Sequence, residues 1–216
     1  KTLYIYGPKH TKDFVNELLK IFNFARNYKI EIKEIDKPGK FLDLKDFYLE
    51  SEKMSHGIPT NAYSFTKKER IRIDKKKLAK SKLPSGPLLQ KLKEGKDINH
   101  KGKIFKSKDL TYLDSGKKIS FILDTNMNKN IVPFVKDSDL LVCESSFHSE
   151  LTDKAREHLH LTSNQAGEIA KKSKSKKLVL THISQRYEKE TKKILDDAKK
   201  HFKNSVLASD FDVIEV

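Results

Sequence analysis

The part of the sequence that decides the fold contains three short apolar runs, ISFIL (119–123), DLLVC (139–143) and KLVLT (177–181). Their length and their content of Ile, Leu and Val are typical of buried strands. The segments between them, around residues 130–136 and 162–173, place apolar residues at helical spacing. Because strands alternate with helices here, the sequence predicts an α/β layer in this part of the chain.

Shorter elements are expected on both sides of this layer. The chain opens with a predicted strand at residues 2–6, a Gly7-Pro8 turn and a predicted helix from about Thr11 to Phe24. Further strands are predicted at 29–35, 47–53, 61–65, 206–208 and 212–216. A lysine-rich helix is predicted from Glu188 to Phe202. With 216 residues, we expect one domain that carries an appendage.

The positive charge of the chain is concentrated in one segment. Lys and Arg number 45 against 30 Asp and Glu, which gives a net charge of +15. Residues 67–106 hold 15 of the basic and 4 of the acidic residues, so +11 of the total lies there. A local excess of this size favours a polyanionic partner, and nucleic acid is the first candidate. Biased lysine usage is the alternative interpretation.

Segment 67–106 is expected to project from the domain as an arm. It contains predicted helical pieces near Asp74–Lys80 and Leu88–Glu94, separated by a break at residues 84–87. We expect it to have too few apolar residues for a core of its own. A solvated surface loop is the alternative, but the charge favours a binding arm.

Cysteine content and hydropathy exclude two classes of protein. The single cysteine, Cys143, excludes an intrachain disulfide framework and predicts a reducing compartment, with the cytoplasm as the default. No apolar run approaches the roughly 18 residues of a membrane span, so no membrane partner is expected. Cys143 ends a predicted strand, where packing is a better interpretation than a nucleophilic role.

Three possible metal ligands stand near predicted strand ends or turns: His56, Asp124 and His182. Zinc binds imidazole nitrogen and carboxylate oxygen, and a carboxylate can bridge two ions in a hydrolytic site. Taken singly, each has a simpler interpretation. A histidine at a strand end is more often a hydrogen-bonded structural residue, and Asp-Thr after a strand is often a helix cap.

Several motifs occur in the order in which ribonuclease Z has them. They are Ile5-Tyr6-Gly7-Pro8-Lys9, Ser85-Gly86-Pro87-Leu88 with Lys91-Leu92-Lys93-Glu94-Gly95, Asp124-Thr125, and Leu180-Thr181-His182-Ile183-Ser184-Gln185-Arg186-Tyr187. Each motif alone is weak, but their joint occurrence is specific and extends from Leu3 to the end of the chain. The sequence therefore resembles ribonuclease Z, the metallo-β-lactamase-fold endonuclease that trims tRNA 3′ ends.

The resemblance implies a fold and a metal centre. The expected fold is α/β (α+β), a metallo-β-lactamase αββα sandwich over residues 1–216, truncated at its N-terminal end, with a flexible tRNA-binding arm at about 67–106. By position, His56 resembles the family's third-motif metal histidine, Asp124 its bridging aspartate and His182 its last histidine ligand. The implied cofactor is zinc, two ions in the complete enzyme, with manganese as the alternative. A homodimer is also implied.

The resemblance also implies an acid relay. Glu144 resembles the glutamate of the family's His-Glu-Ala-Thr-Phe segment, and His160 resembles the histidine of its His-Ser-Thr segment. Such a pair suits protonation of the leaving 3′ oxygen, while Arg186 would stabilise phosphate charge. Three alternatives stay open: Glu144 as a helix cap, His158 as the functional histidine, and Arg186 as a surface ion pair.

Three positions depart from the family pattern. Cys143 replaces a family histidine, Leu123 replaces the usual glycine before the aspartate, and Asn126 stands where arginine is common. These changes keep the expected ligands, but they put the loop geometry in doubt.

In this family the glycine-proline segment belongs to an arm that grips the tRNA away from the cut. The RNA-binding residues implied here are Ser85, Gly86, Pro87, Lys91 and Lys93. Their expected partner is precursor tRNA, which lysines would recognise through phosphates and shape. Binding is therefore expected to weaken steeply with added salt.

The family's principal metal motif, His-x-His-x-Asp-His, occurs nowhere in the sequence. Two explanations are open: a fragment of a longer product, which the non-methionine start favours, or a separate polypeptide that needs a partner such as an N-terminal fragment, or has lost activity. Because His56, Asp124 and His182 complete neither zinc site, we expect negligible catalysis from this chain alone. An unpaired sheet edge or an exposed apolar face is expected at the N-terminal end.

The leading functional prediction is a zinc-dependent endoribonuclease that removes the 3′ trailer from precursor tRNA when the N-terminal motif is supplied. A related metallo-phosphodiesterase for small substrates is one alternative, although it would not need a charge of +11 on an arm. A non-catalytic tRNA-binding remnant or subunit is the other. It would bind tRNA without cleaving it.

Overall fold

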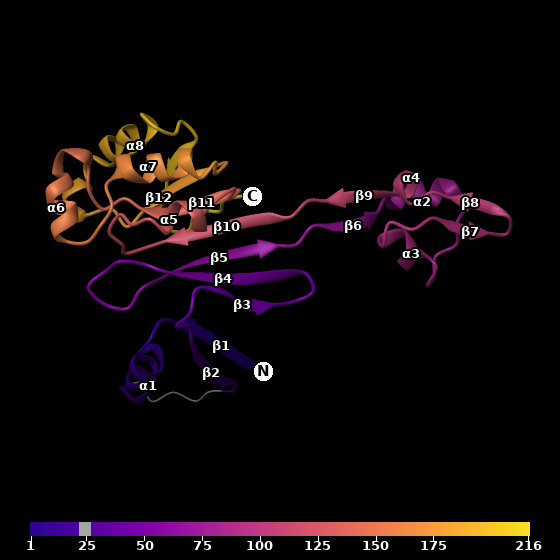
Figure 1. Cartoon of the computed structure of the whole chain (residues 1–216), viewed down its shortest axis with the longest axis horizontal. Coiled ribbons are helices and arrows are strands. Elements are labelled where there is room, and N and C mark those ends of the chain that lie inside the picture. Colours follow the sequence, from indigo (N-terminus) through magenta and orange to yellow (C-terminus); the bar gives the residue numbers. More distant parts are fainter. Residues whose placement is uncertain (22–26) are drawn as a thin grey trace. The chain divides into compact units, whose positions relative to one another are not determined.

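The computed structural model describes residues 1–21 and 27–216, and the chain divides into two compact units (Figure 1). Unit 1 comprises Lys1–Leu44, Tyr48–Thr66 and Lys118–Val216, and unit 2 comprises Lys45–Phe47 and Lys67–Lys117. None of the helices in the described ranges combines the length and the apolar character that a bilayer span requires.

Unit 1 is built on a seven-stranded sheet with the strand order β13-β12-β11-β10-β5-β4-β3. Strands β10 to β13 pair in parallel, whereas β3 and β4 are antiparallel. The strand bounds are β3 Gly39–Asp43, β4 Phe47–Lys53, β5 Asn61–Lys67, β10 Lys117–Ile122, β11 Leu140–Glu144, β12 Leu178–Thr181 and β13 Ser205–Leu207. The parallel part is the α/β layer that the alternating pattern predicts.

Helical segments connect the parallel strands, as parallel pairing requires. Their bounds are α5 Ile131–Phe134, η1 Ser149–Leu151, α6 Thr152–Glu157, α7 Ser163–Lys172, η2 Gln185–Tyr187 and α8 Thr191–Lys199. A capping box starts α7, because Thr162 Oγ1 accepts from the Gln165 backbone N–H and the Gln165 side chain accepts from the Thr162 N–H. The fully buried side chains of Ile122, Leu180 and Ile194 belong to the core between helices and sheet.

The direction of the parallel strands decides where polar residues can gather. The register pairs Ile122 of β10 with Cys143 of β11, and Glu144 of β11 with Thr181 of β12. The carboxyl ends of these three strands therefore meet at one edge of the sheet. In α/β sheets this edge is the usual position for a ligand site.

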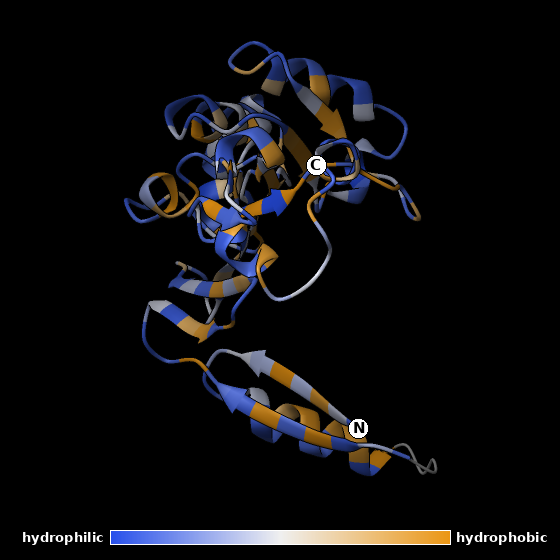
Figure 2. Ribbon diagram, turned by 90° about the vertical axis from the view of Figure 1, so that its right-hand side faces the viewer, coloured by the Kyte–Doolittle hydropathy of each residue, from blue (hydrophilic) through white to orange (hydrophobic). Residues whose placement is uncertain are grey.

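The N-terminal segment of unit 1 forms a separate β-α-β motif. Its elements are β1 (Thr2–Gly7), α1 (Thr11–Ile21) and β2 (Lys29–Glu34), and among the described strands β1 pairs only with β2, in parallel. Helix α1 buries no residue, and its Phe14 and Leu18 are exposed. Figure 2 shows apolar and polar residues side by side in this β-α-β motif, next to the N-terminus. The expected exposed apolar face is therefore present.

Unit 2 is a small α/β body with its own core. Its elements are β6 Arg70–Ile73, α2 Lys75–Ser81, α3 Leu89–Lys93, β7 Ile98–His100, β8 Lys103–Phe105, α4 Ser107–Leu110 and β9 Thr111–Asp114. Strands β6 and β9 pair antiparallel, as do β7 and β8. Five buried residues form one apolar cluster: Leu83, Leu92, Ile98, Phe105 and Leu110. The prediction that this segment lacks a core was wrong, because these residues follow no single period along the chain.

Other sequence predictions differ from the structure in their bounds. Helix α1 is described to Ile21, and the predicted extension through residues 22–24 lies outside the described residues. The predicted strand at 212–216 was wrong, because these residues pair with no described strand and Val213 is 90% exposed. A strand-like sequence pattern leads to a strand only where a neighbouring strand can pair with it through backbone hydrogen bonds.

Candidate active site

Three polar side chains stand at the carboxyl ends of neighbouring parallel strands. Asp124 follows β10, Glu144 is the last residue of β11, and His182 follows β12 directly. The backbone φ angles of Asp124 and His182 are 46° and 55°, and that of Leu159 is 60°. Such values are uncommon for residues other than glycine, and they concentrate at functional sites. The sheet edge therefore carries both the polar groups and the strained backbone of a candidate site.

His182 is held between a hydroxyl and a carboxylate. Its Nδ1 lies 2.8 Å from Ser146 Oγ, and its Nε2 lies 2.9 Å from Asp124 Oδ1. Ser146 Oγ also donates to Glu144 Oε2 over 2.8 Å. A single hydroxyl therefore links the imidazole to the buried glutamate. Ser146 could not be predicted from the sequence, because no pattern distinguishes one serine hydroxyl from the others.

Glu144 is fully buried and is surrounded by donors. Its Oε1 accepts from the Thr125 N–H at 2.5 Å, and its Oε2 accepts from the Leu161 N–H at 3.2 Å. His160 Nδ1 lies 3.1 Å from Glu144 Oε2. These donors replace the water that a buried carboxylate loses. The structure thus brings the predicted relay pair into contact, and Glu144 ends a strand rather than capping a helix.

Three imidazole rings stand in a row beside Asp124. The ring centroids of His56 and His160 are 5.3 Å apart, and those of His160 and His182 are 5.1 Å apart. Asp124, His160 and His182 offer ligand atoms that all lie within 4.8 Å of one another. His56 lies outside this group of three, with its Nδ1 3.2 Å from the Leu159 carbonyl oxygen. The structure therefore joins Asp124 and His182, adds His160, and places His56 one ring further out.

The residues present fit a metal ion. Imidazole nitrogens and a carboxylate oxygen are the donor types that zinc and related ions bind. Asp124 Oδ1 is buried, and its contact among the described residues is the one with His182 Nε2 at 2.9 Å. Ser146 orients the ring of His182, as hydrogen-bond partners of metal ligands do, and Glu144 holds the ring of His160. A cation would be shared by this carboxylate oxygen and the imidazole nitrogen beside it.

A cavity of about 380 Å³ opens beside this cluster. Its lining residues are Ser146, Phe147, His158, His160, His182, Ile183, Ser184 and Arg186. The Arg186 guanidinium lies 4.9 Å from the centroid of the Phe147 ring, and its Nε donates to Ser184 Oγ over 3.1 Å. No carboxylate in the described residues pairs with Arg186, so its charge is available to an anionic ligand.

The three departures from the family pattern lie around the same loop. Cys143 is fully buried in β11, and burial raises the pKa of its thiol well above the ordinary value. This confirms packing as its environment. Leu123 is partly exposed, and the Asn126 N–H donates to the Ser55 carbonyl oxygen at 2.7 Å. The loop that presents Asp124 is therefore held by the backbone before His56.

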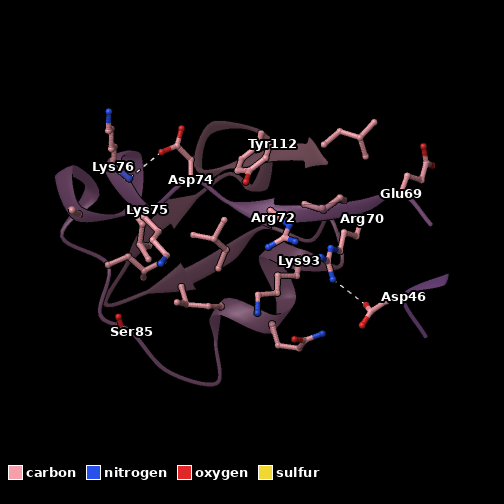
Figure 3. A pocket seen from close by; sticks show the side chains of 18 of the residues that line it. Asp46, Glu69, Arg70, Arg72, Asp74, Lys75, Lys76, Ser85, Lys93 and Tyr112 are labelled. Atoms are coloured by element: carbon pink, nitrogen blue, oxygen red, sulfur yellow. Dashed lines mark hydrogen bonds and ion pairs between the residues drawn. The ribbon is translucent and has the colours of Figure 1, made fainter. Parts of the chain in front are cut away.

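Unit 2 contains a larger cavity, of about 1400 Å³ (Figure 3). Its lining residues include the cations Arg70, Arg72, Lys75, Lys76 and Lys93, together with Ser85 and Tyr112. In Figure 3 the side chains of Arg70, Arg72 and Lys93 gather at the centre of this pocket. Of the predicted RNA-binding residues, Ser85 and Lys93 line it, whereas Gly86, Pro87 and Lys91 do not. Pro87 instead lies two residues before α3, where its carbonyl accepts from the Gln90 N–H at 3.1 Å.

The charges of this pocket are only partly compensated. Asp114 pairs with Lys67 at 2.8 Å, with Arg72 at 2.6 Å and with Arg70 at 3.3 Å. The hydrogen bonds from Lys67 and the two arginines hold the pKa of the Asp114 carboxyl far below its ordinary value. For the ammonium group of Lys93, the described residues offer no ion-pair partner. An anionic ligand would therefore meet a positive surface.

Comparisons with known proteins point in one direction. No family model matches the chain. Ribonuclease Z of Nanoarchaeum equitans is 37% identical over 215 residues, which are 100% of this chain and 67% of that protein. Ribonuclease Z of Lactobacillus helveticus is 36% identical over 220 residues, 99% of this chain and 70% of that protein.

Solved structures show the same fold. The short form of human tRNase Z gives a TM-score of 0.62 at 20% identity, over 99% of this chain and 68% of that one. A metallo-β-lactamase fold protein from Bacillus subtilis gives 0.59 at 18% identity, over 96% of this chain and 62% of that one. At these identities the likeness concerns the fold alone.

The fold and the strand-end cluster together define a metallo-β-lactamase-fold protein with residues suited to metal-dependent hydrolysis. This confirms the predicted fold class. The identity to relatives over the whole length of the chain then fixes the family. The chain belongs to the ribonuclease Z family, whose members are metal-dependent phosphodiester endonucleases.

Proposed function

We propose that this chain carries part of the active site of a tRNA 3′ endonuclease, which cuts the phosphodiester bond that joins the mature tRNA to its 3′ trailer. The observation that carries this proposal is the buried Glu144 bonded to His160, directly beside Asp124 and His182 at one sheet edge. The relatives named ribonuclease Z and tRNase Z supply the substrate class.

Asp124 and His182 are the metal ligands in this proposal, and His56 holds a neighbouring position in the row of imidazoles. Zinc is the proposed ion, with manganese as the alternative. When bound, the metal supplies Lewis acidity to the phosphate and lowers the pKa of water. Zinc in hydrolytic sites takes at least three protein ligands, and a two-ion centre takes more. A complete two-metal centre therefore needs donors from outside these residues, as the sequence predicted from the absent His-x-His-x-Asp-His motif.

His160 is the proposed general acid. Glu144 holds its Nδ1, which leaves Nε2 as the ring nitrogen that gives a proton to the leaving 3′ oxygen. The carboxylate fixes the orientation of the ring. Because His160 is also within reach of Asp124 and His182, it would deliver this proton next to the reacting phosphate.

Arg186 is proposed to stabilise the phosphate. It is exposed, it lines the cavity beside His160 and His182, and it has no described carboxylate partner. A guanidinium in this position meets phosphate oxygens through directed hydrogen bonds.

Unit 2 is proposed to bind the body of the tRNA. Its proposed contacts are Ser85, Gly86, Pro87, Lys91 and Lys93. Support comes from the charge of +11 on residues 67–106 and from the basic cavity that Ser85 and Lys93 line. Each neutralised phosphate releases counterions, so affinity should fall steeply as salt is added. Two further proposals are a homodimer, which follows from the family, and a cytoplasmic location, which the single cysteine favours.

The test is cleavage of a 3′-extended precursor tRNA in the presence of zinc or manganese. This chain alone is compared with the same chain preceded by the N-terminal segment of a ribonuclease Z. We expect cleavage at the discriminator nucleotide only in the complemented form, and its loss in Asp124→Ala and in His182→Ala. His201→Ala, a histidine outside the cluster, is the matched control and should retain activity.

A second candidate function is tRNA binding without catalysis, because the strand-end cluster in the described residues supplies too few ligands for a complete metal centre. A tRNA-binding subunit without catalysis would need unit 2 alone. Salt-sensitive tRNA binding by a folded, complemented protein that never cleaves would favour this function and contradict the endonuclease.

A further inference from the structure

We propose that His158 provides a stacking surface for one unpaired nucleobase next to the scissile phosphate. This proposal rests on the proposed function, because it assumes that an RNA 3′ end enters the cavity beside the strand-end cluster. It concerns a histidine that the acid relay does not use, since Glu144 pairs with His160.

The backbone of His158 is fixed by hydrogen bonds, although the side chain is exposed. It follows α6, and its backbone N–H donates to the Lys154 carbonyl at 3.1 Å. The next two N–H groups, of Leu159 and His160, donate to carbonyls of the same helix at 3.2 and 2.8 Å. The turn that places His160 in the site therefore also fixes the backbone of His158.

The His158 ring stacks on the ring of Phe147. It lies nearly parallel to the Phe147 ring, with an interplanar angle of 11° and a centroid separation of 6.1 Å. Phe147 is buried, whereas His158 is exposed and lines the cavity. Packing against Phe147 limits the orientations of the imidazole. The cavity thus has a flat, polarisable surface at its rim.

The composition of the cavity suits a nucleotide. Its volume of about 380 Å³ lies at the lower end of the range for small-molecule sites, roughly 300–1,000 Å³. It combines the aromatic His158 with the cation of Arg186 and the hydroxyl groups of Ser146 and Ser184. Proteins recognise single-stranded RNA by stacking unpaired bases on aromatic rings while cations hold the phosphates. His158 would take the base, and Arg186 the phosphate beside it.

Stacking would serve a purpose at this position. The bases at the 3′ end of a precursor tRNA are single-stranded, and the reacting phosphate must be held close to His160 and His182. A base fixed on His158 would restrict the adjoining phosphate to this part of the cavity. The role is positioning of the substrate, and the proton still comes from His160.

The experiment uses the full chain and a 3′-extended tRNA with 2-aminopurine in place of one base on either side of the cleavage position. Fluorescence anisotropy of a 5′ label reports RNA binding, and 2-aminopurine emission reports stacking. The wild-type chain should bind the RNA and change the 2-aminopurine emission. His158→Ala should bind with an affinity within about threefold of wild type but lose most of the emission change. His158→Phe should keep the change, and His10→Ala is the control for an exposed histidine in unit 1.

The two readouts separate the possible failures. Normal RNA binding with the same emission change in wild type and in His158→Ala would overturn the stacking proposal and leave the proposed function intact. Absence of RNA binding by the wild-type chain would overturn both. Because His158 is exposed, its variants should unfold at the same midpoint urea concentration as the wild-type chain. An unchanged midpoint would show that a lost 2-aminopurine signal does not come from misfolding.

Discussion

At the scale of single residues, Glu144 decides whether the strand-end cluster works as a relay. It is fully buried and accepts from Thr125, Leu161 and Ser146 while it holds His160. Glu144→Gln keeps the size of the side chain but removes the negative charge that holds the His160 ring.

We therefore expect Glu144→Gln to lower the cleavage rate of the complemented enzyme by about 10²-fold or more, the usual contribution of a general acid. Zinc affinity should change far less, because Glu144 is not a proposed ligand. The exposed Glu150→Gln is the matched control. A rate for Glu144→Gln close to that of Glu150→Gln would mean that the Glu144–His160 pair is structural.

Asp197 is a second buried carboxylate, and it stabilises the fold. Its oxygens accept from Ser149 and from Ser163, whose Oγ lies 2.7 Å away, and it pairs with Lys200 at 3.0 Å. Burial raises the pKa of its carboxyl, but the hydrogen bonds from Ser163, Lys200 and Ser149 outweigh burial and lower it overall. A lowered pKa means that the native state favours the charged form.

Asp197→Asn should therefore reduce the free energy of unfolding at pH 7 by about 1–3 kcal/mol. The contribution of the native carboxylate is complete above its unfolded-state pKa of about 3.9 and is lost as the pH falls through the lower native value. The gap between wild type and Asp197→Asn in urea unfolding should hence narrow from pH 7 to pH 3.5. The exposed Asp153→Asn is the control, and a gap that stays constant with pH would refute the assignment.

At the scale of elements, α7 and α8 pack closely because Gly167 has no side chain. A Cβ at this position would lie 2.5 Å from the Ala198 carbonyl oxygen, which belongs to the α8 backbone. Gly167→Ala should therefore destabilise the protein by about 1–3 kcal/mol through overpacking, although alanine favours helices. The measurement is the thermal unfolding of Gly167→Ala, compared with that of wild type and of the control Glu168→Ala on the same helix. An increase in stability for Gly167→Ala would contradict the close packing.

The core of unit 2 makes a second prediction at this scale. Leu92 of α3 is fully buried among only a few apolar neighbours, and Leu→Ala changes in cores cost about 2–5 kcal/mol. Leu92→Ala should therefore make the lysine-rich unit 2 much more sensitive to trypsin while residues of unit 1 stay protected. Leu88→Ala, which is partly exposed, should digest like wild type. Equal digestion patterns for the two variants would show that unit 2 does not depend on this core.

The elements also show what the sequence could and could not predict. The strands β10, β11 and β12 were predictable because each is a short apolar run, and Asp124 and His182 were predictable as the polar residues that end two of them. The contacts of Asp197 and Ser146 were not, because they join segments 34 to 48 residues apart and 36 residues apart, respectively. Local patterns carry no information on such pairs.

At the scale of the whole molecule, the two units carry two separate parts of the proposed function. Unit 1 holds the strand-end cluster, and unit 2 holds the excess of positive charge. The chain matches about two thirds of the length of its relatives. We propose above all that the strand ends of this chain bind a metal ion.

Zinc titration of the chain, monitored by competition with a chromophoric chelator, tests that claim most directly. We predict that the wild-type chain binds zinc through this incomplete set of ligands, and that binding weakens about tenfold or more in Asp124→Ala and in His182→Ala, because each removes a ligand. His158→Ala, in the same cavity but outside the proposed ligands, should bind zinc as wild type does. Equal zinc affinity in wild type, Asp124→Ala and His182→Ala would contradict the account.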